Sequence, residues 1–151
     1  MNKIIPSAEK PPQLDNQLCF SLYSTALAMN KFYRQRLRAL GITYPQYLVL
    51  MVLWQEDALT VTAIGERLFL DSATLTPLLK RMEAQQLISR QRSLSDERQV
   101  IITLTVEGSA LHHKAIMLSD TVSQAIECSM SEANSLNQQL ITLRSALLKN
   151  A

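Results

Sequence analysis

The two cysteines carry the most reactive side chains of this chain. Cys19 falls in or just after the first turn of a predicted helix, where the positive end of the helix dipole favours the reactive thiolate. Cys128 comes near the end of another predicted long helix. An unpaired cysteine is more often a small buried hydrophobic residue. Thiol chemistry and structural packing therefore both remain open for these positions.

A group of polar residues lies on the outer face of a predicted helix over residues 72–86. Leucines and a methionine recur on its inner face, at helical spacing. The residues turned outward are Ser72, Thr74, Thr76, Pro77, Lys80 and Arg81. Small hydroxyls near a helix N-terminus suit base edges and phosphates, and Lys and Arg suit phosphates or guanines. A solvated helix face would show the same pattern.

Arginines cluster around a predicted β-hairpin that follows Leu87. Arg90, Arg92 and Arg98 lie around its turn, together with Asp96. Asp96 could hold the Arg98 guanidinium in the rigid pose that a narrow A·T-rich minor groove requires. As an isolated surface ion pair, the same two residues would contribute less than about 1 kcal/mol. Two short helices followed by a hairpin form a winged helix-turn-helix, in which the second helix enters a major groove and the hairpin tip reaches the minor groove.

The elements that must position these residues are predicted to be mainly helical. The chain has 151 residues, 47% hydrophobic and 19% charged, with 3 glycines and 5 prolines, which indicates one mainly α globular domain. The predicted helices run from Asp15, as a cap, to Leu40 before Gly41; from Thr43 through the apolar run 48–54; from Val61 to Leu70; from Ser72 to about Gln86; from Thr105, as a cap, to Ile126; and onward from Ser129 or Ser131. The first is about 37 Å long, more than a domain of this size needs for itself, so we expect part of it to pack against another subunit.

Several classes of protein are excluded by the same sequence. The longest apolar run, residues 48–54, is too short to cross a membrane, and the N-terminus has no apolar signal core. Two cysteines without a Cys-x-x-Cys motif argue against a secreted scaffold, so we expect a cytoplasmic protein. We expect no cofactor and no metal, because His112-His113 lacks metal-ligand spacing. Residues 1–13, rich in proline and polar residues, are predicted to form a flexible arm.

Three sequence stretches resemble the MarR family of dimeric winged-helix repressors. They are residues 70–83, Asp96-Glu97-Arg98, and residues 104–108. The resemblance implies a single domain over 14–151, with dimerisation helices in 14–42 and 105–151 and a winged-helix DNA-binding region in 43–104. It also implies that Asp96 orients Arg98 as the minor-groove contact of the wing.

Other fragments, residues 14–23, 40–50 and 68–72, are similar to the organic hydroperoxide resistance regulators within that family. This resemblance implies that Cys19 senses peroxide and that Tyr33 and Tyr44 hydrogen-bond its thiolate. For Cys128 it implies an intersubunit disulfide with the sensor once a sulfenic acid has formed, a reversible lock. Tyr33 lies 14 residues beyond Cys19, about 21 Å along one helix, so a tyrosine that bonds the thiol must come from the other subunit.

The expected function is a non-enzymatic repressor with three partners: double-stranded operator DNA, a second copy of the chain and an organic hydroperoxide. The reduced homodimer would bind an A·T-rich inverted repeat, and oxidation of Cys19 would release it. One alternative keeps the DNA binding but makes a small phenolic or aromatic ligand the trigger. Another is a thiol peroxidase that uses Cys19 and Cys128; no Thr/Arg constellation for activating a peroxide surrounds Cys19 in the sequence.

Overall fold

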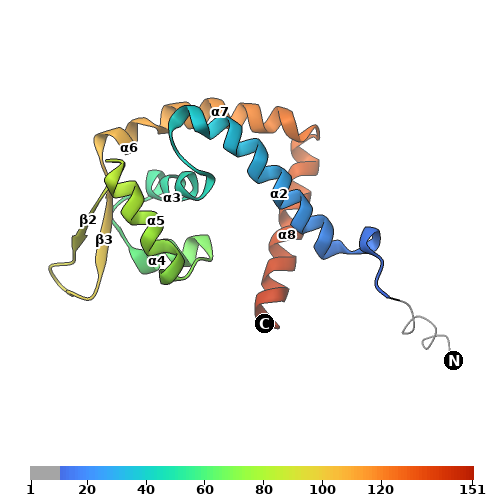
Figure 1. The fold of residues 1–151 in the computed structure, drawn as a ribbon, viewed down its shortest axis with the longest axis horizontal. Helices are drawn as coiled ribbons and strands as arrows, with labels where there is room; N and C mark the ends of the chain where they lie inside the picture. Colours follow the sequence, from blue (N-terminus) through green and yellow to red (C-terminus); the bar gives the residue numbers. More distant parts are fainter. Residues whose placement is uncertain (1–10) are drawn as a thin grey trace.

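The computed structural model describes residues 11–151 (Figure 1), so most of the predicted N-terminal arm lies outside the described residues. In chain order the elements are η1 (Leu14–Asn16), α2 (Leu18–Leu37), η2 (Arg38–Leu40), α3 (Tyr44–Gln55), β1 (Leu59–Thr60), α4 (Val61–Leu68), α5 (Ser72–Ala84), β2 (Ile88–Arg92), β3 (Val100–Leu104), α6 (Val106–Ala110), α7 (His112–Ile126) and α8 (Met130–Lys149). The predicted mainly α fold with a β-hairpin wing is confirmed.

The molecule has two parts with different shapes. Helices α3, α4 and α5 and the sheet form one lobe, from which β2 and β3 project as a wing, whereas α2, α7 and α8 extend away from it (Figure 1). The sheet is antiparallel in the order β1-β3-β2. Strand β1 was not predicted, because two residues are too few to show an alternating pattern; it pairs Leu59 with Ile102 and Thr60 with Ile101.

The first long helix begins later than predicted. Asp15 lies inside the short 3-10 turn η1, so the prediction that it caps the long helix is wrong. Gln17 occupies the N-cap of α2 without a side-chain hydrogen bond, and its extended backbone separates the turn from the helix. The predicted stop at Gly41 is confirmed, since this residue adopts a left-handed conformation with φ of 72° after η2.

Side-chain caps fix the starts of α3, α4, α5, α6 and α8. Thr43 forms a capping box with Gln46 at the start of α3, as the sequence predicted. Thr105 accepts a hydrogen bond from the Gly108 N–H at 3.0 Å and caps α6, and Ser129 forms the capping box of α8. The single helix predicted from Thr105 to Ile126 is wrong, because a tightened turn at Leu111 separates α6 from α7.

Helices α4 and α5 each end two residues before the predicted limit. Phe69 adopts a left-handed conformation with φ of 59° just after α4, and the chain leaves α5 at its C-cap, Gln85. Pro77 is the sixth residue of α5, deeper than the first turn in which a missing N–H costs nothing. The carboxylate of Asp71 caps α5 by accepting a hydrogen bond from the Thr74 N–H at 2.8 Å.

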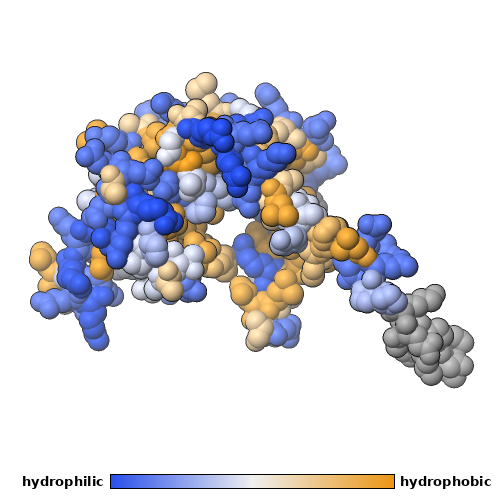
Figure 2. Space-filling model, in the orientation of Figure 1, coloured by the Kyte–Doolittle hydropathy of each residue, from blue (hydrophilic) through white to orange (hydrophobic). Residues whose placement is uncertain are grey.

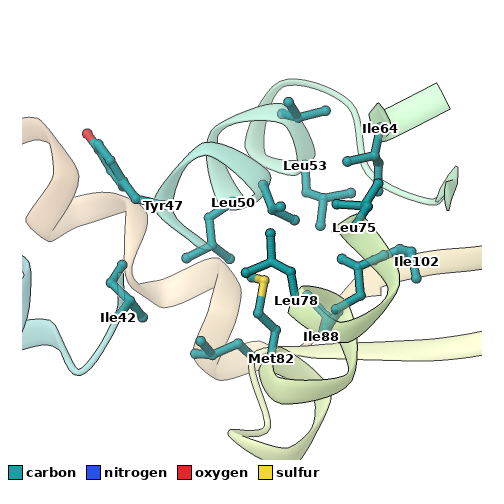
Figure 3. Packing of buried hydrophobic residues seen from close by; sticks show 14 of the residues in the cluster. Ile42, Tyr47, Leu50, Leu53, Ile64, Leu75, Leu78, Met82, Ile88 and Ile102 are labelled. Carbon is teal, nitrogen blue, oxygen red and sulfur yellow. The ribbon is translucent and has the colours of Figure 1, made fainter. Parts of the chain in front are cut away.

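The hydrophobic core lies in the winged-helix lobe. Figure 3 shows side chains of α3, α4, α5 and the strands converging on one cluster. The fully buried members with the largest side chains are Leu37, Leu50, Leu53, Ile64, Leu75, Leu79, Met82, Ile88 and Ile102. Helix α3 contributes residues from all sides, as its uniformly apolar sequence predicted, and it therefore forms the centre of the lobe.

The terminal helices are far less buried. Helix α2 buries only Leu37 among its 20 residues, and α8 buries none of its 20. Figure 2 shows hydrophobic side chains gathered on the exposed surface of this part of the molecule. No helix within residues 11–151 is both long and apolar enough to span a membrane.

Candidate redox site and nucleic-acid interface

Cys19 lies where the sequence placed it, at the start of a long helix. It is the second residue of α2, its thiol is free, and its side chain is exposed. The first turn of a helix has N–H groups without helical partners, which favour a negative charge. Cys19 is thus accessible to a dissolved oxidant.

A cluster of three tyrosines lies at the opposite end of the same helix. The ring centroids of Tyr33 and Tyr44 are 4.4 Å apart, and those of Tyr33 and Tyr47 are 6.1 Å apart. Burial raises the pKa of Tyr33 to about 12, and the neighbouring tyrosines add to the effect. Burial also raises the pKa of Tyr44. Both hydroxyls therefore keep their protons at neutral pH and can donate hydrogen bonds to an anion.

Cys19 does not meet these tyrosines within one chain. Helix α2 is continuous from Leu18 to Leu37, so the 14 residues between Cys19 and Tyr33 span about 21 Å along its axis. The structure thus brings Tyr33 and Tyr44 together and leaves Cys19 apart from them. Any site that combines the thiol with the two hydroxyls requires a second copy of α2.

Cys128 lies just beyond α7, in the bend that leads to α8. Its side chain is partly buried and its thiol is free. The preceding residue, Glu127, ends α7 in a left-handed conformation with φ of 56°. The second cysteine is therefore held at a corner of the backbone and not on a regular helix.

The outer face of α5 presents most of the predicted DNA-contacting residues to solvent. Ser72, Thr74, Pro77, Lys80 and Arg81 are exposed, whereas Thr76 is partly buried. The leucines and the methionine on the opposite face are buried. The division of this helix into a core face and an outer face agrees with the predicted spacing.

The wing holds its arginines in three different ways. The backbone N–H and the Nε of Arg98 donate to Asp96 Oδ1 at 3.1 and 3.2 Å, while 91% of the Arg98 side chain stays exposed. These hydrogen bonds hold the pKa of Asp96 below its usual value. Arg92 donates to the backbone carbonyl of Glu97 at 2.8 Å. Arg90 pairs with Glu83 of α5 at 3.0 Å, which ties the base of the wing to the last turn of α5.

A pocket of about 500 Å³ opens beside the tyrosine cluster, between the end of α2 and the start of α3. It is lined by Asn30, Arg34, Arg38, Gly41, Ile42, Thr43, Tyr44 and Pro45. Arginine, tyrosine and apolar side chains share its wall, so it suits a small aromatic or anionic molecule. Within residues 11–151, no group of three or more His, Cys, Asp or Glu side chains could hold a metal ion. His112 and His113 are exposed.

Comparison with known proteins identifies the family of this chain. Residues 31–115 match the family model described as transcriptional regulator SarA/Rot. The organic hydroperoxide resistance transcriptional regulator of Bacillus subtilis (strain 168) is 48% identical over 135 residues, which cover 89% of this chain and 92% of the relative. This chain belongs to the MarR-type transcriptional regulators. The resemblance of this MarR-type regulator to the hydroperoxide resistance group, first seen in its motifs, is thereby confirmed.

Two solved structures relate this MarR-type regulator to defined redox forms. It superposes on reduced AbfR bound to DNA with a TM-score of 0.80 and 36% identity, covering 99% of this chain and 98% of the other. AbfR is a protein of Staphylococcus epidermidis. The disulfide form of AbfR gives a TM-score of 0.64 at 42% identity, covering 86% and 91%. Of these two, the fold described here is more similar to the reduced, DNA-bound form.

Sequence reasoning missed two parts of the sensor region of this MarR-type regulator. Tyr47 follows Tyr44 by three residues, so the i, i+3 spacing on one helix could have predicted its place in the tyrosine cluster. The pocket residues Arg34 and Arg38 are likewise one helical turn apart, but no spacing rule predicts that the α2–α3 connection folds over them.

Proposed function

We propose that this chain is a redox-sensing transcriptional repressor. Its reduced homodimer binds an A·T-rich inverted repeat and releases it when an organic hydroperoxide oxidises Cys19. The observation that carries the proposal is the layout of α2, with a free, exposed thiol in its first turn and two protonated tyrosine hydroxyls at its other end. A two-fold symmetric pairing of two α2 helices joins the thiol of one copy to the tyrosines of the other.

The dimer is assembled through the helices that expose apolar side chains. We assign residues 14–42 and 105–151 to dimerisation and residues 43–104 to DNA binding. Leu18 is 66% exposed, Leu136 is 53% exposed and Leu147 is 51% exposed in the single chain. Large exposed apolar patches of this kind mark interfaces. The same surfaces provide the contact that the sensor site needs.

The chemistry begins with the Cys19 thiolate, held by hydrogen bonds from Tyr33 and Tyr44 of the other subunit. The sulfur attacks the peroxide oxygen that carries the hydrogen, the O–O bond breaks, and the alkoxide that leaves takes a proton from water to become the alcohol. Cys19 becomes a sulfenic acid, oxidised by two electrons, and the peroxide is reduced by two. The Cys128 thiol of the other subunit then attacks this sulfur, and a disulfide forms as its proton leaves with the hydroxyl group as water. Each thiol reacts once, so the protein consumes peroxide without catalytic turnover.

DNA recognition uses α5 and the wing. Ser72, Thr74, Thr76 and Pro77 lie toward the N-terminal half of α5 and face base edges and phosphates, and Lys80 and Arg81 neutralise phosphates or read guanine. The wing residues are assigned separately: Arg98, oriented by Asp96, enters the minor groove, Arg92 contacts the backbone, and Arg90 positions the wing through Glu83.

A second candidate trigger is a small phenolic or aromatic acid. The pocket beside Tyr44 favours it, because two arginines and an apolar wall could bind a carboxylate and a ring. This alternative predicts that such a ligand releases DNA from fully reduced protein, which the peroxide mechanism does not.

The deciding experiment measures binding to the DNA upstream of the gene itself by fluorescence anisotropy. Reduced protein, protein treated with cumene hydroperoxide, and treated protein with added dithiothreitol are compared. We expect the reduced protein to bind DNA tightly, the peroxide-treated protein to lose this binding, and added dithiothreitol to restore it. Cys19→Ser should bind DNA and ignore peroxide. Cys128→Ser should form no intersubunit disulfide on a non-reducing gel and retain the first oxidation, seen as an added oxygen by mass spectrometry.

The controls separate the competing functions. Release of DNA from Cys19→Ser by peroxide would overturn the proposed sensor. Release from reduced wild-type protein by benzoate or a phenol would favour the ligand mechanism. Sustained consumption of peroxide in the presence of a thiol reductant would instead indicate a peroxidase.

A further inference from the structure

Among the side chains that the structure describes, Gln46 is the buried polar one, with only 3% of its surface exposed. Burying an amide is costly unless its hydrogen-bonding groups are satisfied. Gln46 is the third residue of α3 and lies between two members of the tyrosine cluster, Tyr44 and Tyr47. A buried polar group at this position requires partners on both of its polar atoms.

The partners of Gln46 come from two separate parts of the fold. Its Oε1 accepts a hydrogen bond from the Thr43 N–H at 3.1 Å, within the capping box. Its Nε2 donates to Oε1 of Gln85 at 2.8 Å, across 39 residues of sequence. Gln85 in turn donates from its Nε2 to the backbone carbonyl of Gly41 at 3.0 Å. The two amides thus clamp the α2–α3 connection at both of its ends, Gly41 and Thr43.

Gln85 is also the C-cap of α5, the helix assigned to the major groove. Its backbone N–H bonds the Arg81 carbonyl at 3.0 Å, and Glu83, two residues earlier, pairs with Arg90 of the wing. Hydrogen bonds therefore connect the segment that carries Tyr44 to the end of α5, and the last turn of α5 joins them to the Glu83–Arg90 pair at the base of the wing.

We propose that the Gln46–Gln85 pair is a positioning link that couples the redox state of the tyrosine site to the orientation of α5. The inference rests on the proposed function, because it assumes that Tyr44 responds to oxidation of Cys19. When the thiolate loses its charge, Tyr44 loses its acceptor and the start of α3 shifts. The amide pair carries this shift to α5, since both of its ends are fixed by hydrogen bonds. Gln46 and Gln85 touch neither peroxide nor DNA in this scheme.

The test compares the Kd for operator DNA of oxidised and reduced protein in three variants. Gln85→Ala removes both amide contacts and leaves Nε2 of the buried Gln46 without its partner, so the thermal midpoint of this variant is measured beside its Kd. We expect reduced Gln85→Ala to bind DNA nearly as well as wild type, and the ratio of oxidised to reduced Kd to fall by about fivefold or more, the lower range of typical coupling between sites. Gln85→Glu keeps the acceptor for Gln46 and loses the donor to Gly41, so its ratio should lie between those of Gln85→Ala and wild type.

Gln55→Ala is the matched control. Gln55 lies at the other end of α3 and accepts a hydrogen bond from Arg67 at 2.9 Å, so this variant also deletes an amide contact of α3, but away from the tyrosines. Its ratio should equal that of the wild type. Thermal midpoints and the mass of the oxidised protein are recorded for each variant. A loss of stability would change the midpoint, and incomplete oxidation would change the mass, so each can be distinguished from a change in the Kd ratio alone.

Each outcome has a distinct meaning. A wild-type ratio in Gln85→Ala, with the wild type itself switching normally, would overturn the positioning link and leave the redox function intact. An equal fall of the ratio in Gln55→Ala would also overturn it, because any lost contact of α3 would then suffice. Failure of the wild type to release DNA after confirmed oxidation would overturn the proposed function and the link with it.

Discussion

The winged-helix lobe and the terminal helices differ in the burial of their apolar residues. In the lobe, Ile64, Leu75 and Ile102 are completely buried, and each contacts a core that a single chain supplies. In α2 and α8, apolar side chains recur with the same helical spacing, yet most of them remain exposed. The hydrophobic effect drives both sets out of water with similar strength per unit area.

The difference shows that one chain completes the part assigned to DNA binding but not the part assigned to oxidation sensing. Cys19 and the Tyr33–Tyr44 pair lie at opposite ends of α2, in the region whose apolar side chains remain exposed in a single chain. In the lobe, the core and the caps of α3, α4 and α5 fix the surfaces assigned to DNA. Oxidation at an interface can therefore change the distance between two lobes without unfolding either of them.

The largest expected effect comes from a charge placed on the exposed apolar face of α8. Leu140→Asp buries an unpaired carboxylate in the proposed dimer interface, which is strongly unfavourable. We expect sedimentation to show a monomer, and affinity for a two-half-site operator to fall by about 100-fold or more as bivalent binding is lost. Thr62→Asp, at an exposed residue of α4 outside the segments assigned to dimerisation, should leave the sedimentation behaviour unchanged. A dimeric Leu140→Asp protein would contradict the division between the two regions.

A smaller effect is expected from a cavity in the lobe. Leu75→Ala should lower the free energy of unfolding by about 2–5 kcal/mol, because Leu75 is 0% exposed and the space left behind cannot refill completely. The loss should be the same at low and high protein concentration. Leu147→Ala, on α8, should destabilise more at high concentration than at low, because its contacts form only in the dimer. Urea unfolding at two protein concentrations distinguishes the two cases.

The parts of the fold that local sequence predicted are those in which neighbouring residues decide the structure. The capping boxes at Thr43 and Ser129 and the core stripe of α5 require only residues three or four positions apart. Strand β1 could not be predicted in this way, because its two residues are extended only through pairing with β3. Asp15 has the side chain of a cap, but the chain bends at Gln17 before the helix starts.

The candidate sites divide in the same manner. The Asp96–Arg98 pair spans two residues and could be predicted from the turn, whereas the Arg90–Glu83 pair joins a strand to a helix. The Gln46–Gln85 contact crosses 39 residues, and neither glutamine has a distinctive sequence pattern for it. Long-range polar pairs depend on how elements pack, which the pattern of a single segment does not contain.

Removal of the wing arginine should weaken DNA binding without affecting either the core or the dimer. Arg98→Ala is expected to cost about 1–3 kcal/mol of binding free energy, at least severalfold in Kd, through loss of the minor-groove contact. Arg38→Ala, also the loss of an exposed arginine but at the end of α2, should change Kd much less. Fluorescence anisotropy with one operator at fixed salt provides the comparison, and equal Kd values for the two variants would remove the wing from the interface.

The smallest expected effect is a loss of stability in acid. Hydrogen bonds from Thr74 and Arg98 hold the pKa values of Asp71 and Asp96 below the usual value of 3.8, so both carboxylates are more readily ionised in the folded state. Their contribution is complete above that value and is lost as pH falls through the lower, folded pKa. The thermal midpoint should therefore stay level from pH 7 to about 5 and fall below about pH 4. Asp71→Asn keeps a side chain that caps a helix well but cannot ionise. Its thermal midpoint should therefore differ from that of the wild type more at neutral pH than at pH 3. An equal fall of the thermal midpoint in acid in this variant would show that Asp71 does not contribute to that fall.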